Sequence, residues 1–267
     1  MKKAMAALTL CMAMMLCAGI AGAAGSSLEI QPLTIELQVE PGRAYTNTIS
    51  LKNTGSAPEH VKAYCQDWAM KPDGLVVFVD AGKLTQSASP WVTLSPTDFD
   101  LAPGDTVQVR YTIRPPADAK GEFRTVIIFE GSAQAMTLHG GASRVIPRLG
   151  SVVYVQCGPI PQPQARITQF VVTADGGLLV VENTGPAHLR FTGRLEIGQS
   201  GQIVRSLDLT GFVVLPSPFN RHQVRIAKES LADLVPGEYE LTAILDCGGP
   251  ALLGARTSLA LAPAKAK

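Results

Sequence analysis

The four histidines are the side chains of this sequence best suited to acid–base or metal chemistry: His60, His139, His188 and His222. None has a second histidine, a cysteine or a carboxylate at the sequence spacing of a metal site. Gly198-Gln199-Ser200-Gly201 is one residue short of a nucleophile elbow and lies in an expected β-hairpin. We therefore predict a protein that is not an enzyme, with no catalytic residue, no metal ion and no cofactor.

Charge and composition limit the partners. Charged residues make up 17% of the 267-residue chain, and the formal net charge is +1. Lys2 and Lys3 lie in an expected export signal, so the mature chain is close to neutral. Because electrostatic attraction dominates binding to nucleic acid, we expect no nucleic-acid partner.

The first 23 residues have the pattern of a secretory signal peptide. Lys2 and Lys3 precede an apolar run from Ala4 to Ile20, and the small residues Ala21-Gly22-Ala23 close it. The run is shorter than the roughly 20 residues that span a bilayer, which disfavours a retained membrane anchor. We predict cleavage, export to the periplasm and no transmembrane span in the mature chain, with the cell surface as the alternative location.

Three cysteines remain after the signal: Cys65, Cys157 and Cys247. In an immunoglobulin-like sandwich the first strand begins at the same end as the turn between the last two strands. Cys157 and Cys247 have these positions in the second half of the chain, and an oxidising compartment permits a disulfide between them. Three unpaired structural thiols are the alternative.

The elements expected in the body of the chain are strands. Short runs of Val, Ile, Leu and Thr alternate with turn residues, and no stretch keeps helical spacing. The expected strands are 33–39, 45–52, 59–67, 75–79, 107–114, 123–130, 145–155, 166–173, 178–183, 191–197, 204–209, 220–226, 238–246 and 253–261. This pattern predicts an all-β protein of two tandem immunoglobulin-like β-sandwiches.

A proline-rich segment divides the two halves. Pro159, Pro161 and Pro163 follow closely on Cys157 and exclude a central strand there. We predict domains at 28–156 and 165–262, joined by a linker at 157–164.

The two halves also echo each other. Asn53-Thr54-Gly55 recurs as Asn183-Thr184-Gly185, and Leu101-Ala102-Pro103-Gly104 recurs as Leu234-Val235-Pro236-Gly237. Both echoes have an offset of about 130 residues and keep their order, which favours two related sandwiches.

The last expected strand of the first domain is the best candidate for a binding element. An edge strand can lend its backbone to another chain, and Pro147 confines its part of the strand to an edge or a bulge. The alternative is an ordinary final strand after a hairpin loop at 131–142.

The order of motifs in the first domain resembles the PapD-like periplasmic pilus-assembly chaperones. The motifs that carry the resemblance are Val39-Glu40-Pro41-Gly42, Asn53-Thr54-Gly55, Asp67-Trp68, Ser89-Pro90-Trp91-Val92, Leu94-Ser95-Pro96, Phe99 to Gly104, the strand Val107 to Ile113, Gly121-Glu122-Phe123-Arg124 and the strand Arg148 to Val155. The resemblance covers residues 28–156 well and the second domain only by length and strand pattern.

The resemblance implies a two-domain chaperone whose donor strand completes the sandwich of a secreted pilus or fimbrial subunit, without ATP. An outer-membrane usher is a further partner that it implies. The donor-strand residues carried over to this sequence are Val145, Ile146, Arg148, Leu149, Val152 and Tyr154.

The sequence departs from the family pattern at the carboxylate anchor. In that family two basic residues in the cleft between the domains hold the subunit's C-terminal carboxylate. The first anchor falls near Leu37, where no basic residue stands, and the second near Gly150, which leaves Arg148 as the substitute. A structural or adhesive cell-envelope protein built on the same sandwiches is therefore the alternative function.

Overall fold

The computed structural model describes residues 27–138 and 141–262. The expected signal peptide at 1–23 lies outside the described residues. Among those residues, no helix is long and apolar enough to cross a membrane.

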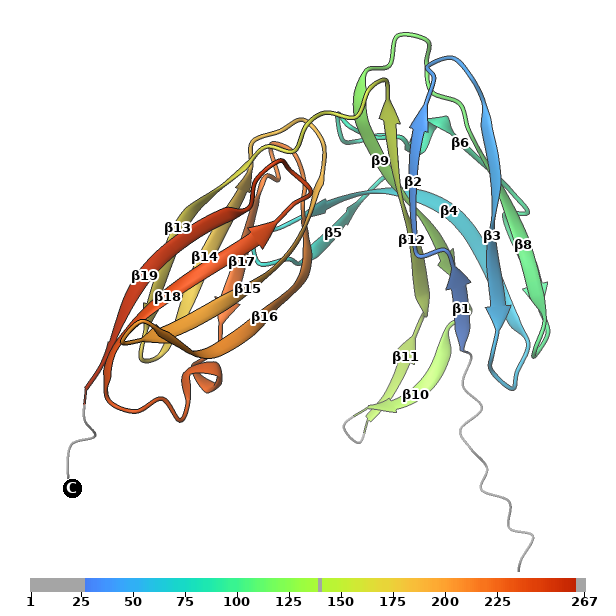
Figure 1. Ribbon diagram of the computed structural model, residues 1–267. Coiled ribbons are helices and arrows are strands. Elements are labelled where there is room, and N and C mark those ends of the chain that lie inside the picture. Colours follow the sequence, from blue (N-terminus) through green and yellow to red (C-terminus); the bar gives the residue numbers. More distant parts are fainter. Residues whose placement is uncertain (1–26, 139–140, 263–267) are drawn as a thin grey trace, which may run out of the picture.

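The first half of the chain forms a sandwich of two antiparallel-rich sheets, which confirms the predicted fold class (Figure 1). One sheet has the order β1-β3-β8-β6 and the other β2-β12-β9-β4-β5, with β7 also paired to β4. Their bounds are β1 Leu28–Gln31, β2 Thr34–Val39, β3 Tyr45–Asn53, β4 Glu59–Met70, β5 Val76–Val79, β6 Val92–Ser95, β7 Asp98–Leu101, β8 Thr106–Ile113, β9 Gly121–Glu130 and β12 Arg148–Cys157. A separate hairpin pairs β10 Gln134–Leu138 with β11 Gly141–Val145.

The second half forms another sandwich, with sheets β13-β14-β17 and β16-β15-β18-β19. The strands are β13 Ala165–Thr173, β14 Gly176–Asn183, β15 Leu189–Gln199, β16 Gln202–Val214, β17 Arg221–Ile226, β18 Gly237–Asp246 and β19 Leu253–Leu261. Each expected strand beyond 165 has a counterpart here. In the first sandwich the short strands β1, β6 and β7 and the hairpin β10–β11 were not anticipated, because each is too short to show a clear alternating pattern.

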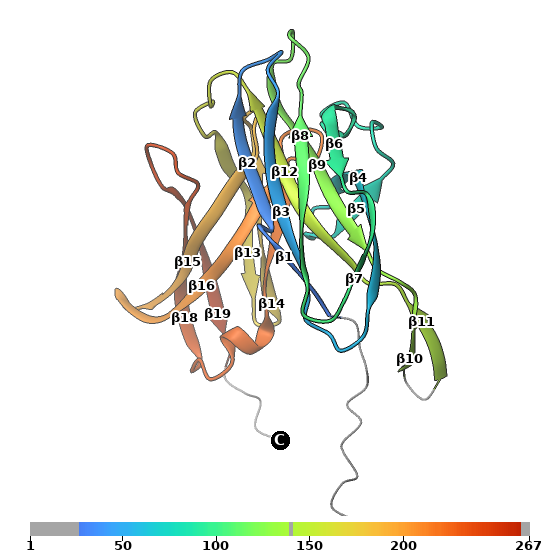
Figure 2. The ribbon, with the colours of Figure 1, turned by 90° about the vertical axis from the view of Figure 1, so that its right-hand side faces the viewer.

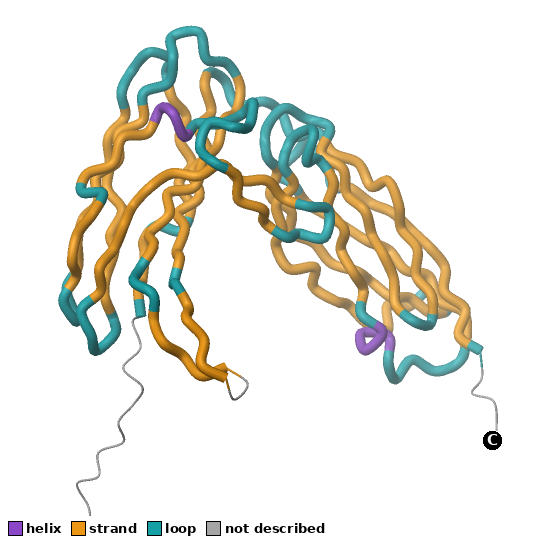
Figure 3. The backbone as a smooth tube through the Cα atoms, turned by 180° about the vertical axis from the view of Figure 1, so that it is seen from behind, coloured by secondary structure: helices purple, strands orange, loops and turns teal. Residues whose placement is uncertain are grey.

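Each sandwich has its own apolar core, and a third apolar cluster joins the two. Trp68, Val126, Ile128 and Tyr154 of the first sandwich pack with Leu215 of the second, and all five are nearly inaccessible to solvent. We call this cluster the junction. It fixes one end of each sandwich to the other, and the two bodies diverge from it at an angle (Figures 1 and 3).

A buried asparagine organises the turn between β3 and β4. The amide nitrogen of Asn53 donates to the carbonyls of Ala57 at 2.8 Å and Leu101 at 3.0 Å, and its side-chain oxygen accepts from the Gly55 amide at 2.9 Å. The side chain therefore ties its own turn to the end of β7.

Asn183 makes the same set of bonds in the second sandwich. It donates to Ala187 at 2.7 Å and to Val214 at 3.0 Å, and it accepts from Gly185 at 2.8 Å. The first sequence echo thus marks equivalent turns in two related sandwiches.

The second sequence echo does not mark equivalent positions. Pro103–Gly104 precedes β8, which pairs with β3, whereas Pro236–Gly237 precedes β18, which pairs with β15. The strand equivalent to β8 is β17, because it pairs with β14, the counterpart of β3. Pro-Gly turns open many strands, so their recurrence does not establish equivalence.

We expect Asn53→Ala and Asn183→Ala each to lower the free energy of unfolding by about 1–3 kcal/mol, because each change leaves buried carbonyl and amide groups without a partner. Chemical denaturation measures this, with the exposed Asn47→Ala as the control. A loss no greater than that of the control would refute the structural role of the turn.

Candidate functional site

The edge of β12 is paired along only part of its length. On one side β12 pairs with β9 from Arg148 to Cys157, and on the other side it pairs with β2 only from Val152 onward. No strand of the described chain pairs with Arg148–Ser151 on that second side. Just before β2, the chain passes through Pro32 from β1, which belongs to the opposite sheet.

The unpaired edge presents specific backbone groups. The amide of Val152 donates to the Leu33 carbonyl at 2.9 Å, on the side of β2. Because backbone groups of successive strand residues point to alternate sides, the N–H and C=O of Gly150 and Arg148 face this same open side. The edge therefore offers donors and acceptors to an additional strand.

The predicted continuous strand 145–155 is interrupted. β11 ends at Val145 and β12 begins at Arg148, so Ile146 and Pro147 lie between them. Pro147 has no amide hydrogen, and its carbonyl accepts from Gly131 at 2.9 Å. The hairpin β10–β11 continues the line of β9 and β12 beyond the break and projects from the body of the first sandwich (Figures 1 and 2).

Four of the predicted donor-strand residues lie at or near this open edge. Val145 pairs with Gln134 in the hairpin, and Ile146 is 48% exposed. The guanidinium of Arg148 contacts Glu130 at 2.6 Å, and Leu149 packs against the first core. Arg148 is therefore already neutralised within the sandwich.

Of the other two predicted residues, Tyr154 belongs to the junction and Val152 lies beside it. Val152 packs against it, and Tyr154 is 4% exposed and stacks on His188 of the second sandwich with ring centroids 3.7 Å apart. The open part of the edge therefore ends before Val152.

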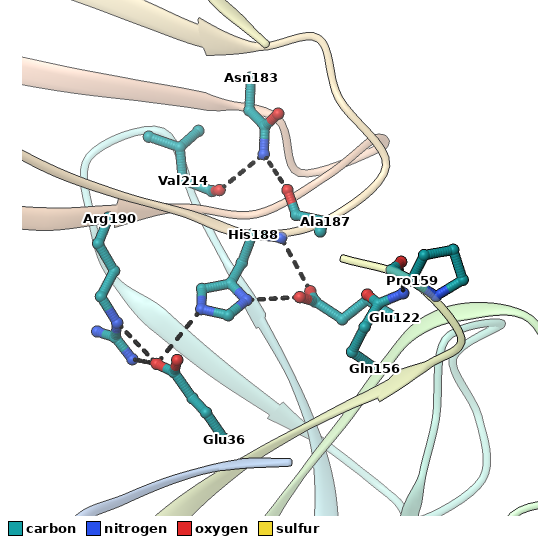
Figure 4. A network of polar contacts seen from close by, with 9 residues as sticks. All are labelled: Glu36, Glu122, Gln156, Pro159, Asn183, Ala187, His188, Arg190 and Val214. Carbon is teal, nitrogen blue, oxygen red and sulfur yellow. Dashed lines mark hydrogen bonds and ion pairs between the residues drawn. The ribbon is translucent and has the colours of Figure 1, made fainter. Parts of the chain in front are cut away.

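A polar network continues the junction, centred on His188 (Figure 4). One oxygen of Glu122 contacts the ring Nδ1 at 2.6 Å, and the other accepts from the backbone amide of His188 at 3.0 Å. The Glu122 side chain is 3% exposed. This two-point contact joins β9 to the beginning of β15.

Glu36 of β2 closes the network at the surface. It accepts two hydrogen bonds from the guanidinium of Arg190, at 2.8 and 2.5 Å, and lies 3.6 Å from Nε2 of His188. Burial raises the pKa of Glu36, but the hydrogen bonds and charges of Arg190 and His188 outweigh it and hold the pKa below its ordinary value.

Arg124 is buried beside the junction, and its guanidinium has few hydrogen-bond partners. It is 2% exposed, its guanidinium carbon lies 5.9 Å from the ring centroids of Trp68 and Phe219, and its Nε donates to the Trp68 carbonyl at 3.4 Å. Both terminal nitrogens are buried without a hydrogen-bond partner. Burial lowers the pKa of Arg124, with the nearby charge of Glu122 acting in the opposite direction.

The predicted disulfide is absent: Cys157 and Cys247 are free, as is Cys65. Cys157 belongs to the first core, whereas Cys247 packs against the second, so the two thiols belong to different sandwiches. Burial raises the pKa of Cys65 to about 12, which makes this thiol unreactive at neutral pH.

Sequence reasoning missed the His188 network. Glu122 and His188 are 66 residues apart and lie in different sandwiches, so no local spacing connects them. His60 likewise lies between two carboxylates, 2.8 Å from Asp100 and 3.1 Å from Asp98, across the pairing of β4 with β7. Among the described residues, no group of three or more His, Cys, Asp or Glu side chains is placed so that it could hold a metal ion.

Searches of the sequence against known families and curated proteins find no match. Among solved structures, the chain is similar to the CsuC–CsuE chaperone–tip adhesion subunit pre-assembly complex from archaic chaperone-usher Csu pili of Acinetobacter baumannii, with 12% identity over 87% of this chain and 98% of that one and a TM-score of 0.47. It is also similar to the CupB2 chaperone of Pseudomonas aeruginosa, with 12% identity, coverage of 87% and 100% and a TM-score of 0.44. The YadV chaperone gives 9% identity, coverage of 87% and 99% and a TM-score of 0.47.

Each of these similar structures is a chaperone or contains one. At TM-scores below 0.5 the likeness carries no argument about function. The function is therefore argued from the edge of β12 and its surroundings.

The contact between Glu36 and Arg190 predicts a pH dependence of stability. Because the folded-state pKa of Glu36 is lowered, this contribution is complete above the unfolded-state pKa and is lost as the pH falls through the folded-state pKa. Wild type should exceed Glu36→Gln in unfolding free energy near neutral pH, and the difference should shrink as the pH falls below the ordinary pKa of a glutamate. Denaturation at several pH values, with the exposed Glu29→Gln as control, measures this; a difference that grows on acidification contradicts it.

We expect His188→Phe to lower the unfolding free energy by about 2–4 kcal/mol, because it keeps a ring against Tyr154 but removes a donor from the buried Glu122. His60→Phe is the matched control, because its carboxylate partners are solvent-exposed and should cost at most about 1 kcal/mol. Equal effects of the two changes would show that the buried contact between His188 and Glu122 does not stabilise the fold more than an exposed one does.

Proposed function

We propose that this protein is a periplasmic chaperone or assembly factor for secreted pilus or fimbrial subunits that binds its clients by edge-strand donation. The observation that carries the proposal is the unpaired edge of β12 from Arg148 to Ser151. An incomplete sandwich has an open edge of its own, and an added strand satisfies both edges at once.

The donated backbone groups are those that face the open side, on Arg148 and Gly150. Next to them, Ile146 is the apolar side chain most available to a partner, since Leu149 is held in the first core. We therefore assign the donor segment to residues 144–151, shorter than the stretch to Tyr154 expected from the sequence.

Strand donation of this kind needs no ATP. The free energy comes from hydrogen bonds along the new ladder and from burial of the client's exposed apolar groove. A client leaves when a strand that pairs better with the same groove replaces the donor.

The carboxylate anchor implied by the resemblance is not part of this proposal. At the first anchor position Leu37 stands beside Glu36, which is bound to Arg190, and Arg148 is bound to Glu130. The recognition of clients therefore rests on the donor segment. The same proposal places the protein in the periplasm after removal of the signal, with an outer-membrane usher as a further partner.

Removing one backbone N–H group from the open edge tests the proposal. Arg148→Pro removes an amide hydrogen that faces the open side and is not used in the ladder with β9. Arg148→Gln keeps the amide and, like the proline variant, loses the contact with Glu130, so it is the matched control. A photo-crosslinking residue at Ile146, with capture from the periplasm of the host and mass spectrometry, identifies the client.

We expect wild type and Arg148→Gln to capture a small secreted β-rich subunit that crosslinks within residues 144–151, and Arg148→Pro to capture about tenfold less, as the loss of one hydrogen bond to a partner implies. Equal capture by both variants would exclude donation at this edge. Recovery of the wild type alone at the outer surface would favour the structural or adhesive envelope protein.

A further inference from the structure

A cavity of about 610 Å³ lies between the hairpin of β4 and β5 and the second sandwich. It is separate from the β12 edge. The first sandwich contributes Ala69, Met70, Lys71, Pro72, Val77, Val79 and Leu84, and the second contributes Pro218, Phe219, Asn220 and Arg221. Its volume and its position between two domains are typical of small-ligand sites.

The walls of this cavity are held in place from both sides. The tip of the β4–β5 hairpin is bound to the second sandwich, because the amide of Gln223 donates to the carbonyl of Pro72 at 2.6 Å. Gly74 lies so close to His222 that a Cβ atom there would be 3.1 Å from the imidazole Cε1. In Figure 1 this hairpin reaches from the first sandwich toward β17. The cavity is therefore preformed.

The charged side chains that line the cavity are all basic. Its lining is largely aliphatic and aromatic, with two basic residues, Lys71 and Arg221, and no acidic residue. Within the described part of the chain, no carboxylate lies within ion-pair distance of Lys71, which is exposed. Arg221 is 61% exposed and reaches Glu182 only at 3.8 Å, so it keeps donors for another acceptor.

A third positive charge lies behind one wall. The guanidinium carbon of Arg124 is 5.9 Å from the ring centroid of Phe219, whose side chain lines the cavity, and its terminal nitrogens have no partner. Because Arg124 is buried, water screens its charge weakly. Glu122 and Asp67 act on Arg124 with charges of the opposite sign, so the two basic lining residues, Lys71 and Arg221, are what favour an anion in the cavity.

We propose that this cavity binds a small anionic amphiphile, with an apolar chain along Val77, Val79 and Phe219 and an anionic head between Lys71 and Arg221. The proposal is independent of strand donation. Because the walls come from both sandwiches, such a ligand also stabilises their relative position.

Dodecanoate is the probe, used below its micellar concentration with the complete signal-processed protein, and dodecyltrimethylammonium has the same chain with the opposite charge. Calorimetry should show one dodecanoate bound per chain, at least about tenfold tighter than the cation. In methyl NMR spectra, dodecanoate should shift the resonances of Val77 and Val79.

Lys71→Gln combined with Arg221→Gln should weaken dodecanoate binding by about tenfold or more, and Lys83→Gln combined with Arg225→Gln, an equal change of charge outside the cavity, should not. Arg148→Pro should bind dodecanoate like the wild type, which separates this site from the donor edge. The proposal is overturned by an absence of binding, by equal affinity for both amphiphiles, by unchanged affinity after the first pair of substitutions, or by resonance shifts confined to other methyl groups.

Discussion

The outward face of β9 is the constraint on which the rest of the structure depends. Strands of an antiparallel sandwich usually bury one face, but β9 is buried on both along most of its length. Its inward residues fill the first core, while Glu122, Arg124, Val126 and Ile128 face the second sandwich or the junction. The two sandwiches are therefore joined through a strand interior to a sheet, and not only through the linker.

This docking divides the outer face of the sheet into a covered part and an open part. Tyr154 and Val152 of β12 are covered by the junction, whereas Arg148 to Ser151 lie beyond it and have no β2 partner. An exposed edge is an aggregation hazard that charge and proline reduce. Arg144, Pro147 and Arg148 supply these features here, and they leave a short unpaired stretch that a specific partner can use.

The junction combines apolar packing with polar groups whose roles differ. Leu215 and Tyr154 supply buried apolar area, and the free energy gained by burying it does not depend on direction. The contacts of Glu122 with both the ring and the backbone of His188 are directional, so they select one alignment of β9 with β15. Arg124 lacks such satisfaction, because a buried guanidinium with two unpartnered nitrogens costs stability.

The sequence by itself determined the features that local patterns encode. Alternation and turn residues predicted most strands and the two-sandwich architecture, and the repeated Asn-Thr-Gly turn identified equivalent positions, because a buried asparagine that bonds its own turn is a local device. Only the tertiary structure decided which distant groups meet. It paired His188 with Glu122 across 66 residues, placed Cys157 and Cys247 in different cores, and ended the open edge of β12 at Val152. These contacts arise from the packing of one sandwich on the other, and no spacing within the sequence carries that information.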